Sequence, residues 1–296
     1  FGVILAFSFS VGAQESAEVP AVSSEVAYIL NTFLFLVCGF LVMFMAAGFC
    51  MLEAGQVRSK NTAVICLKNI GLFSIAGFMY YLVGYNLMYD GVDGGYMGSF
   101  SIFDRSSDVD LETGYAAASD WYFQMVFVAT TASIVSGALA ERILIWPFFL
   151  FTAILTAFIY PIAGSWQWGG GWLSEMGFSD FAGSTLVHSV GGYAALAGAI
   201  ILGPRDGKYS ADGKVNVLGG CSLPMTTLGV FILWLGWFGF NGGSQLALGS
   251  GADATAVADI FVNTNLAAAG GVLACMIVSK ATNSHTNIAA TLNGAI

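Results

Sequence analysis

The 296-residue chain is strongly apolar: 57% of its residues are hydrophobic and only 9% are charged. A soluble domain carries about 25% charged residues, so the composition excludes a soluble globular protein and predicts an all-α polytopic membrane protein in a lipid bilayer. The net charge of −9 comes from residues that lie almost entirely between the apolar runs, and no nucleic-acid partner is expected. The 38 glycines fit this class, because small residues let helices approach closely in lipid.

The two ends of the chain bear on how much of the protein is represented. Residues 1–13, FGVILAFSFSVGA, are apolar but too few to span a bilayer, and a polar segment follows at 14–25. We interpret residues 1–13 as the remnant of a signal peptide cut near Ala13, and 14–25 as an extracytoplasmic tail; a shortened first transmembrane helix is the alternative. The other end, TLNGAI, stops inside an apolar run, so we expect a partial transmembrane domain at 26–296.

Apolar runs of bilayer length predict seven membrane spans and the start of an eighth. The spans cover roughly residues 26–52, 62–88, 119–140, 143–163, 184–203, 220–241 and 257–279, and the last begins near residue 286. All spans are expected to be helical.

Lysine and arginine set the expected orientation. Arg58 and Lys60 follow the first span, Arg142 follows the third and Arg205 the fifth, whereas Arg105 lies in a loop on the opposite side. By the positive-inside rule the odd-numbered spans end in the cytoplasm. We therefore expect a multi-pass protein of the inner or plasma membrane with its N-terminus outside, as a cleaved signal peptide also requires.

The loops on the opposite side are acidic. The acidic residues there are Asp90, Asp93, Asp104, Asp108, Asp110, Glu112, Asp120, Glu175 and Asp180. Two interpretations stay open: a solvated surface, or an electrostatic funnel that concentrates a cation. Screening acts beyond roughly 10 Å, so only acids close to a pore mouth would contribute to a funnel.

Two glycine-rich segments are similar to each other and indicate an internal repeat. Span one ends inside with GFCMLEAGQ from Gly48, and span six ends outside with GFNGGSQ from Gly239. Five spans per repeat would invert the second copy, an arrangement that many transporters use to place a binding site at the membrane midplane.

Charged and sulfur-containing residues inside the spans also lead to expectations. Lys68 lies within span two, where a charge is costly, and we expect it to reach toward the cytoplasmic end or to pair with an acid such as Glu53.

The five cysteines have no CxxC spacing and lie in or beside apolar runs. We interpret them as small buried residues, neither a disulfide framework nor a metal site.

The segment DFAGSTLVHSVGG from Asp180 places one histidine, His188, in an apolar run. Asp180 is suited to cap the start of a helix, and Gly203 followed by Pro204 is suited to end it. His188 would then lie roughly 12 Å below the cap, toward the middle of the bilayer. An ionisable group at that depth indicates a functional site, and a histidine that only hydrogen-bonds a neighbouring helix is the alternative.

Aromatic residues gather at the expected outer ends of three spans. They are Trp121, Phe123 and Phe127 on span three, Trp166, Trp168 and Trp172 after span four, and Trp237 and Phe240 on span six, with Ser244 beyond them. Each group alone is typical of the aromatic belt at a membrane interface. Together, with a hydroxyl oxygen nearby, they indicate a cation cage, in which a cation over an aromatic face gains about 0.5 to 2 kcal/mol.

Five ordered motifs resemble the ammonium transporter (Amt/Mep/Rh) family, more closely its Amt branch. They are EAGQVRSKN from Glu53, SGALAER from Ser136, WGGG from Trp168, DFAGSTLVHS from Asp180 and GWFGFNGGS from Gly236. The resemblance covers nearly all of the chain after the proposed signal peptide.

The resemblance implies a fold, an assembly and partners. The fold is an Amt-type inverted-repeat helical bundle of eleven spans, of which about seven to eight are represented here. The first five-helix repeat would cover about 26–203, and the second would start within about 220–296. The family also implies a homotrimer with a pore in each subunit, nitrogen uptake as ammonium with methylammonium as an analogue, and a PII-type regulator at the cytoplasmic face.

The resemblance further implies roles for particular side chains at the outer end. Trp168 and Ser244, with Phe127, resemble the family's external ammonium site. Phe127 and Phe240 resemble its stacked phenylalanine gate, and Phe123 is similar to a further aromatic residue of that vestibule.

Two more residues resemble deeper parts of the family's pathway. Asp180 is similar to a buried acid that acts structurally and electrostatically near the recruitment site. His188 resembles the first of two pore histidines. The second is expected beyond Ile296, because His285 falls in a predicted cytoplasmic loop and is interpreted as a surface residue.

The chemistry of ammonium predicts what such a pore must do. Its pKa lies near that of lysine, about 10.4, so the charged form dominates outside. Moving an unpaired ion of that size into a low-dielectric interior costs on the order of 20 kcal/mol, far more than a cation cage returns. We expect recruitment of the cation, deprotonation below Phe127 and Phe240, passage of ammonia, and proton relay through His188.

Functions other than transport differ in what they require of the sequence. An ammonium sensor coupled to a cytoplasmic signalling domain stays open, and a downstream kinase or cyclase module would identify it. A Rhesus-type channel for an uncharged gas is disfavoured by Trp168 and Ser244, which suit a cation. The sequence contains no GxSxG, HExxH or P-loop motif, so neither an enzyme nor a metal or other cofactor is expected.

Overall fold

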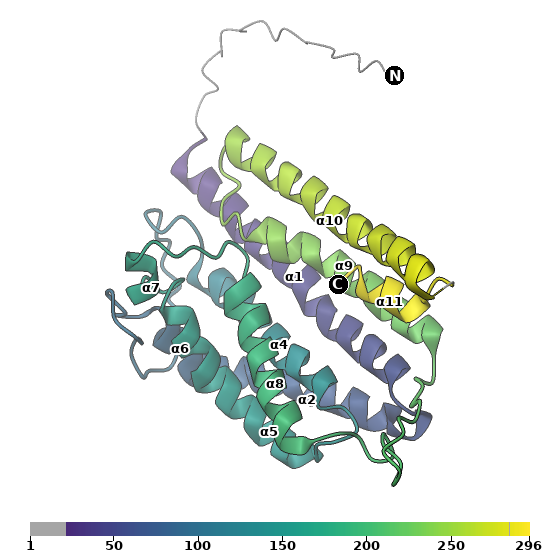
Figure 1. Cartoon of the computed structure of the whole chain (residues 1–296). Coiled ribbons are helices and arrows are strands. Elements are labelled where there is room, and N and C mark those ends of the chain that lie inside the picture. The colour runs from purple at the N-terminus through teal and green to yellow at the C-terminus, as the bar shows by residue number, and fades with distance from the viewer. Residues whose placement is uncertain (1–21, 284) are drawn as a thin grey trace, which may run out of the picture.

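A computed structural model of the chain describes residues 22–283 and 285–296 (Figure 1). The proposed signal-peptide remnant at 1–13, the cut near Ala13 and most of the tail at 14–25 lie outside the described residues. The described part is helical apart from its loops and one isolated β-bridge between Tyr209 and Val215.

Eleven α-helices occupy the described residues. They are α1 (Ser24–Gln56), α2 (Thr62–Met79), α3 (Tyr85–Tyr89), α4 (Ala117–Ala138), α5 (Ile145–Ile154), α6 (Tyr160–Ser165), α7 (Trp172–Glu175), α8 (Val190–Leu202), α9 (Leu223–Gly243), α10 (Gly251–Asn283) and α11 (Ile288–Asn293). A short 3₁₀ turn, Ser59–Asn61, precedes α2. Each of the seven predicted spans coincides with one of these helices or with a continuous helical run, and α11 starts close to the predicted eighth.

Six helical runs within residues 22–283 and 285–296 are long and apolar enough to cross a bilayer. The predicted span that is not among them is α4, which carries buried polar residues such as Asp120, Gln124 and Thr131. α4 contacts α1, α2 and α8, so these side chains face protein (Figure 1). A central helix can be polar because its neighbours shield it from lipid.

Helices α1 and α9 pack antiparallel and join the first part of the chain to the last (Figure 1). Their backbones approach so closely that a Cβ atom on Gly229 would lie 2.4 Å from the backbone nitrogen of Leu52, and one on Gly239 would lie 2.5 Å from the carbonyl oxygen of Cys38. Only glycine fits at these two positions, which is how small residues bring membrane helices together.

Three wider π-helical turns interrupt the spans, at Tyr80–Gly84, Leu155–Ile159 and Ser184–Ser189. The second precedes Pro161, whose ring nitrogen cannot donate a backbone hydrogen bond. The third starts after Gly183, whose φ of 92° suits glycine, and contains His188. Such wide turns are frequent at functional sites, so the backbone itself marks His188 as unusual.

The loops that follow spans one, three and five meet at one end of the bundle, here called the basic end. The Glu141 carboxylate there accepts hydrogen bonds from the Arg58 guanidinium at 3.0 Å, the Asn61 amide at 2.6 Å and the Arg205 guanidinium at 3.1 Å. Burial raises the pKa of Glu141, but the bonds from Arg58 and Asn61 outweigh it and lower that pKa to about 2. The opposite end, where Trp168 and Ser244 lie, is called the aromatic end.

Lys68 pairs with Glu53 inside the bundle, which confirms one of the two sequence expectations for this lysine. Its Nζ lies 3.3 Å from Glu53 Oε2 and donates to the carbonyl oxygen of Ser136 at 2.7 Å. The Ser136 hydroxyl donates to the same carboxylate oxygen at 2.8 Å. All three residues are buried, so the Lys68 ammonium group is compensated inside the bundle.

The five cysteines are free thiols in the structure, and the interpretation that all five are buried was wrong. Cys38 is buried between helices, whereas Cys66 and Cys221 are exposed on the protein surface. Cys66 lies on the outer face of α2, a face that lipid can cover, and an apolar sequence context cannot distinguish lipid from protein interior.

Candidate functional site

A cavity of about 300 Å³ lies at the aromatic end. Its lining residues are Tyr85, Tyr89, Tyr115, Asp120, Phe123, Gln124, Phe127, Trp168, Phe181, Ser244 and Leu246. Among them are the four residues that the sequence predicts for an outer cation site and vestibule: Trp168, Ser244, Phe127 and Phe123. The structure thus brings together these four side chains from three separate segments of the chain.

A stacked pair of phenylalanine rings closes this cavity on the side of His188. The ring centroids of Phe127 and Phe240 lie 4.0 Å apart with an angle of 27° between the ring planes, and both residues are buried. Phe123 packs edge-on against Phe127 at 4.8 Å. Stacked rings at van der Waals distance leave no room for an ion between them.

Trp168 and Ser244 border the same pair from the cavity. The Trp168 ring lies 5.9 Å from Phe127 and is held by a hydrogen bond from its Nε1 to the carbonyl oxygen of Asp180 at 2.7 Å. The Ser244 hydroxyl donates to the carbonyl oxygen of Phe240 at 2.8 Å. The hydroxyl hydrogen is used there, so the Ser244 oxygen presents its lone pairs as acceptors.

Asp180 fixes the segment that leads from Trp168 to His188. Its buried carboxylate accepts hydrogen bonds from four consecutive backbone N–H groups, residues 183–186, at 2.8 to 3.0 Å. The predicted capping role is therefore confirmed, although the helical turn itself begins at Ser184 and not at Asp180. An acid held in this way stabilises the helix start and places negative charge beside the cavity wall.

His188 lies on the far side of the phenylalanine pair from the cavity. Its ring centroid is 5.4 Å from that of Phe240, in an edge-to-face arrangement. Its Nδ1 lies 3.1 Å from the carbonyl oxygen of Gly183. Since a carbonyl oxygen only accepts hydrogen bonds, this contact requires the proton on Nδ1 and leaves the Nε2 lone pair able to accept a proton.

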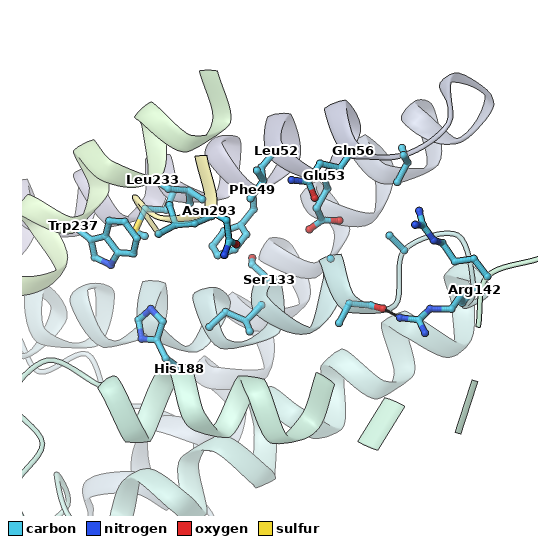
Figure 2. A pocket seen from close by; sticks show the side chains of 18 residues that line it. Phe49, Leu52, Glu53, Gln56, Ser133, Arg142, His188, Leu233, Trp237 and Asn293 are labelled. Carbon is cyan, nitrogen blue, oxygen red and sulfur yellow. Dashed lines mark hydrogen bonds between the residues drawn. The ribbon is translucent and has the colours of Figure 1, made fainter. Parts of the chain in front are cut away.

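A second cavity, of about 650 Å³, runs from His188 toward the basic end. Figure 2 shows His188 and Trp237 at one end of it, Arg142 at the other, and the Glu53 carboxylate extending from α1 between them. The phenylalanine pair therefore stands between two cavities, one lined by rings and a hydroxyl, the other by His188 and, farther along, charged groups.

Several aromatic residues do not belong to the predicted cage. Trp237 was expected at the level of Trp168, but it lines the cavity on the basic side beside His188. Trp121 stacks on Phe103 at 5.9 Å, away from the cavity, because it lies on a different face of α4 from Phe127. The sequence alone placed these rings at one level but could not assign the helix face.

Asp120 was also misplaced by the sequence interpretation, which counted it among the exposed acids of a loop. It is buried within α4 and accepts hydrogen bonds from the Tyr85 hydroxyl at 2.5 Å and the Gln124 amide at 3.3 Å. Its spacing from Phe123, Gln124 and Phe127 is that of one helical face, and this was the signal that could have placed it at the cavity. The tyrosines that line the cavity with it were not predicted at all.

His285 is exposed, in agreement with its interpretation as a surface residue. It lies after α10 and lines neither of the two cavities. Of the two histidines, only His188 lines the second cavity, next to the phenylalanine pair that separates it from the first.

The fold and the site together define a multi-pass helical membrane protein with two cavities separated by a phenylalanine pair. The chain belongs to the Ammonium Transporter Family, whose family model matches residues 33–296. It is 44% identical to ammonium transporter Amt2 of Archaeoglobus fulgidus over 271 residues, which covers 88% of this chain and 56% of that protein. It is 36% identical over 290 residues to ammonium transporter 3 of Dictyostelium discoideum, covering 97% of this chain and 65% of that protein.

Solved structures of the family have the same fold. A structure titled Sensor Amt Protein superimposes with a TM-score of 0.84 at 37% identity and covers 91% of this chain and 67% of that one. Candida albicans Mep2 superimposes with a TM-score of 0.79 at 30% identity, covering 93% of this chain and 60% of that one. The expected Amt-type helical bundle is thereby confirmed. The chain spans between about half and two thirds of the length of curated relatives that it matches.

Proposed function

We propose that the protein to which this chain belongs transports ammonium across a membrane. The observation that carries the proposal is the closed Phe127–Phe240 pair, with a cavity suited to a cation on one side and His188 on the other. Family membership supports the same cargo, since the relatives named above are ammonium transporters.

Recruitment takes place in the cavity at the aromatic end. An ammonium ion there is attracted by the ring faces of Trp168 and Phe127 and donates a hydrogen bond to the Ser244 oxygen. The rings contribute about 0.5 to 2 kcal/mol, more as water is removed. Asp180 holds the Trp168 indole in place through its carbonyl oxygen, which makes it a positioning residue for the cage.

Beyond the pair, the cargo proceeds as ammonia. The cost of an unpaired ion in a low-dielectric passage, on the order of 20 kcal/mol by the idealised Born estimate, is avoided when the proton is left behind. Phe127 and Phe240 act as the gate, and Phe123 supports the first ring. His188, whose Nε2 can accept a proton, is the first member of a proton relay and hydrogen-bonds ammonia in passing.

The proposal includes an orientation and an assembly. The basic end, with Arg58, Arg142 and Arg205, faces the cytoplasm, so that α1 begins outside the inner or plasma membrane. The family resemblance adds a homotrimer with one pore in each subunit and a PII-type regulator that binds at the basic end. Methylammonium serves as the transported analogue.

The full-length protein reconstituted in lipid vesicles tests the proposal. We expect saturable uptake of labelled methylammonium that ammonium inhibits and that a tenfold excess of potassium leaves largely unchanged. Parallel measurement of current shows whether the proton crosses with the cargo. Vesicles that take up no more methylammonium than protein-free vesicles would exclude transport by this protein.

A sensor is the second candidate, and the similarity to a structure titled Sensor Amt Protein is the observation that favours it. A sensor would bind ammonium in the same cavity and pass the signal to a cytoplasmic domain. Ammonium binding by the full-length protein without uptake, together with an ammonium-dependent change in a downstream kinase or cyclase activity, would identify this function.

A further inference from the structure

A buried carboxylate in the wall of the aromatic-end cavity is not used by the mechanism above. Asp120 is only 7% exposed and lies in the first part of α4. The tyrosines Tyr85, Tyr89 and Tyr115 line the same cavity. Asp120 comes one helical turn before Gln124 and about two turns before Phe127, on the same face of α4, so it is farther from the phenylalanine pair than the Trp168 cage is.

The groups bound to Asp120 carry no positive charge. The Tyr85 hydroxyl donates to one carboxylate oxygen and the Gln124 amide to the other. In the part of the chain that the structure describes, the ion pairs involve other acids: Glu53, Glu141 and Asp212. A carboxylate can accept about four hydrogen bonds, so Asp120 has acceptor positions left after these two.

A buried carboxylate in this situation either takes up a proton or is compensated by a cation from outside the chain. The cavity makes the second solution available, because Asp120 lines a space of about 300 Å³ together with aromatic rings. Rings and a carboxylate favour the same ligand, a small cation with N–H donors. Tyr85 and Tyr89, whose ring centroids are 5.2 Å apart, form one aromatic side of this part of the cavity.

We propose that Asp120, with Tyr85, Tyr89 and Tyr115, forms a second cation subsite, where a small primary ammonium ion pairs with the carboxylate before it moves to Trp168 and Ser244. This inference rests on the proposed transport function and refines it: the cavity holds its cargo in two successive positions. Asp120 attracts the ion by charge, and the Trp168 cage then selects it at the gate.

The test is the concentration dependence of methylammonium uptake by the full-length protein in vesicles. Asp120→Asn keeps the shape of the side chain and removes its charge. We expect the half-saturating concentration to rise about tenfold or more, with the maximal rate within about twofold of the wild type, because an ion pair in a partly desolvated cavity is lost. Asp120→Glu keeps the charge and is expected to stay within about threefold of the wild type.

Two control variants separate ion pairing from other effects. Asp108→Asn removes an exposed acid of the neighbouring loop, and we expect it to change the half-saturating concentration less than twofold. Tyr85→Phe removes a hydrogen bond to Asp120 but keeps the carboxylate and the ring of the subsite, so we expect the half-saturating concentration to rise by about threefold or less, clearly below the rise in Asp120→Asn. If Asp120 only anchored Tyr85, Tyr85→Phe would show the same defect as Asp120→Asn.

The outcomes distinguish this inference from the transport function itself. If the wild type takes up methylammonium and Asp120→Asn has the same half-saturating concentration, the subsite is overturned. Asn resembles a neutral, protonated carboxyl group, so this result would mean that no charge at residue 120 is needed. A tenfold rise in Asp120→Glu overturns it as well, and does so even if the Asn variant is not recovered as folded protein. No uptake by the wild type contradicts the transport function instead.

Discussion

Glu53 and Asp120 are both carboxylates buried within the helical bundle, and the difference lies in what compensates them. Glu53 is 3.3 Å from the ammonium group of Lys68 and also receives the Ser136 hydroxyl. Asp120 receives only a phenol and an amide, and it lines a cavity. The chain thus supplies the counter-charge for the first acid, and we propose that the cargo supplies it for the second.

Buried charges of these two kinds differ in what they contribute to the protein. A charge whose partner is built into the chain contributes to the fold, because removing either partner leaves the other unpaired. A charge that lacks such a partner and faces a cavity is positioned to bind a ligand. His188 is positioned in a similar way although it is not a buried charge, since it lies between the phenylalanine pair and the second cavity with one ring nitrogen available.

The largest effect on transport is expected at His188. His188→Ala removes the side chain that we propose as the proton acceptor below the Phe127–Phe240 pair, and we expect methylammonium uptake to fall by about 100-fold or more, since a positioned acid–base group contributes that much. Uptake and current in vesicles measure it. The control is His285→Ala, which changes the exposed histidine and should leave uptake unchanged. Full proton-coupled current in His188→Ala would remove this residue from the mechanism.

The largest effect on stability is expected at Lys68. Lys68→Met leaves the Glu53 carboxylate buried without a cation, and we expect a loss of about 3 to 5 kcal/mol, measured as a lower unfolding temperature of the purified protein. The double variant Glu53→Gln, Lys68→Met should recover most of this loss. Asp120→Asn should cost about 1.5 kcal/mol, because both donors to Asp120 are uncharged and the Asn Oδ1 can still accept one of the two hydrogen bonds. Equal losses of stability in Lys68→Met and Asp120→Asn would contradict the view that the chain compensates Glu53 but not Asp120.

A smaller effect is expected at Trp168. Trp168→Leu removes one ring face from the cage, and the half-saturating concentration should rise about 2- to 30-fold, corresponding to 0.5 to 2 kcal/mol. Competition by potassium should become stronger at the same time. Trp166→Leu is the matched control, because Trp166 lies at the same end but does not line the cavity. Methylammonium uptake indistinguishable from wild type in Trp168→Leu would count against the cage.

The smallest effect concerns Glu141 and extends the comparison to the basic end. Its pKa is lowered from 4.5 to about 2 in the folded protein, so its contribution to stability is complete above pH 4.5 and is lost as the pH falls toward 2. We expect Glu141→Gln to lower stability by about 1 kcal/mol at neutral pH. The difference in unfolding temperature between this variant and wild type should shrink below pH 4.5. A difference that stays constant down to pH 2 would contradict this interpretation.

Much of the architecture was predictable because bilayer thickness imposes the length of each span. The predicted spans coincide with helices, and the loops after spans one, three and five do meet at one end through Glu141. The partner of Lys68 was also named correctly, since few acids lie near enough in a span to compensate it. The capping role of Asp180 followed from its position before an apolar run.

The parts that sequence could not predict depend on helix face and on long-range contacts. Trp237 shares a helix with Phe240 but points into the other cavity. Asp120 was interpreted as an exposed loop acid because predicted helix boundaries are uncertain by several residues. The tyrosine lining comes from two separate segments, α3 with Tyr85 and Tyr89 and the residues just before α4 with Tyr115, and only the folded chain brings Tyr85 to Asp120.

The most direct test of the central claim compares a cargo that can lose a proton with one that cannot. Labelled methylammonium and labelled rubidium, an alkali cation similar in size to ammonium, are offered to the same vesicles that contain the full-length protein. Deprotonation at the gate predicts saturable methylammonium uptake and rubidium uptake no greater than in protein-free vesicles. Rubidium entering at a rate comparable with methylammonium would show that the ion itself crosses between Phe127 and Phe240, and would contradict deprotonation at the gate.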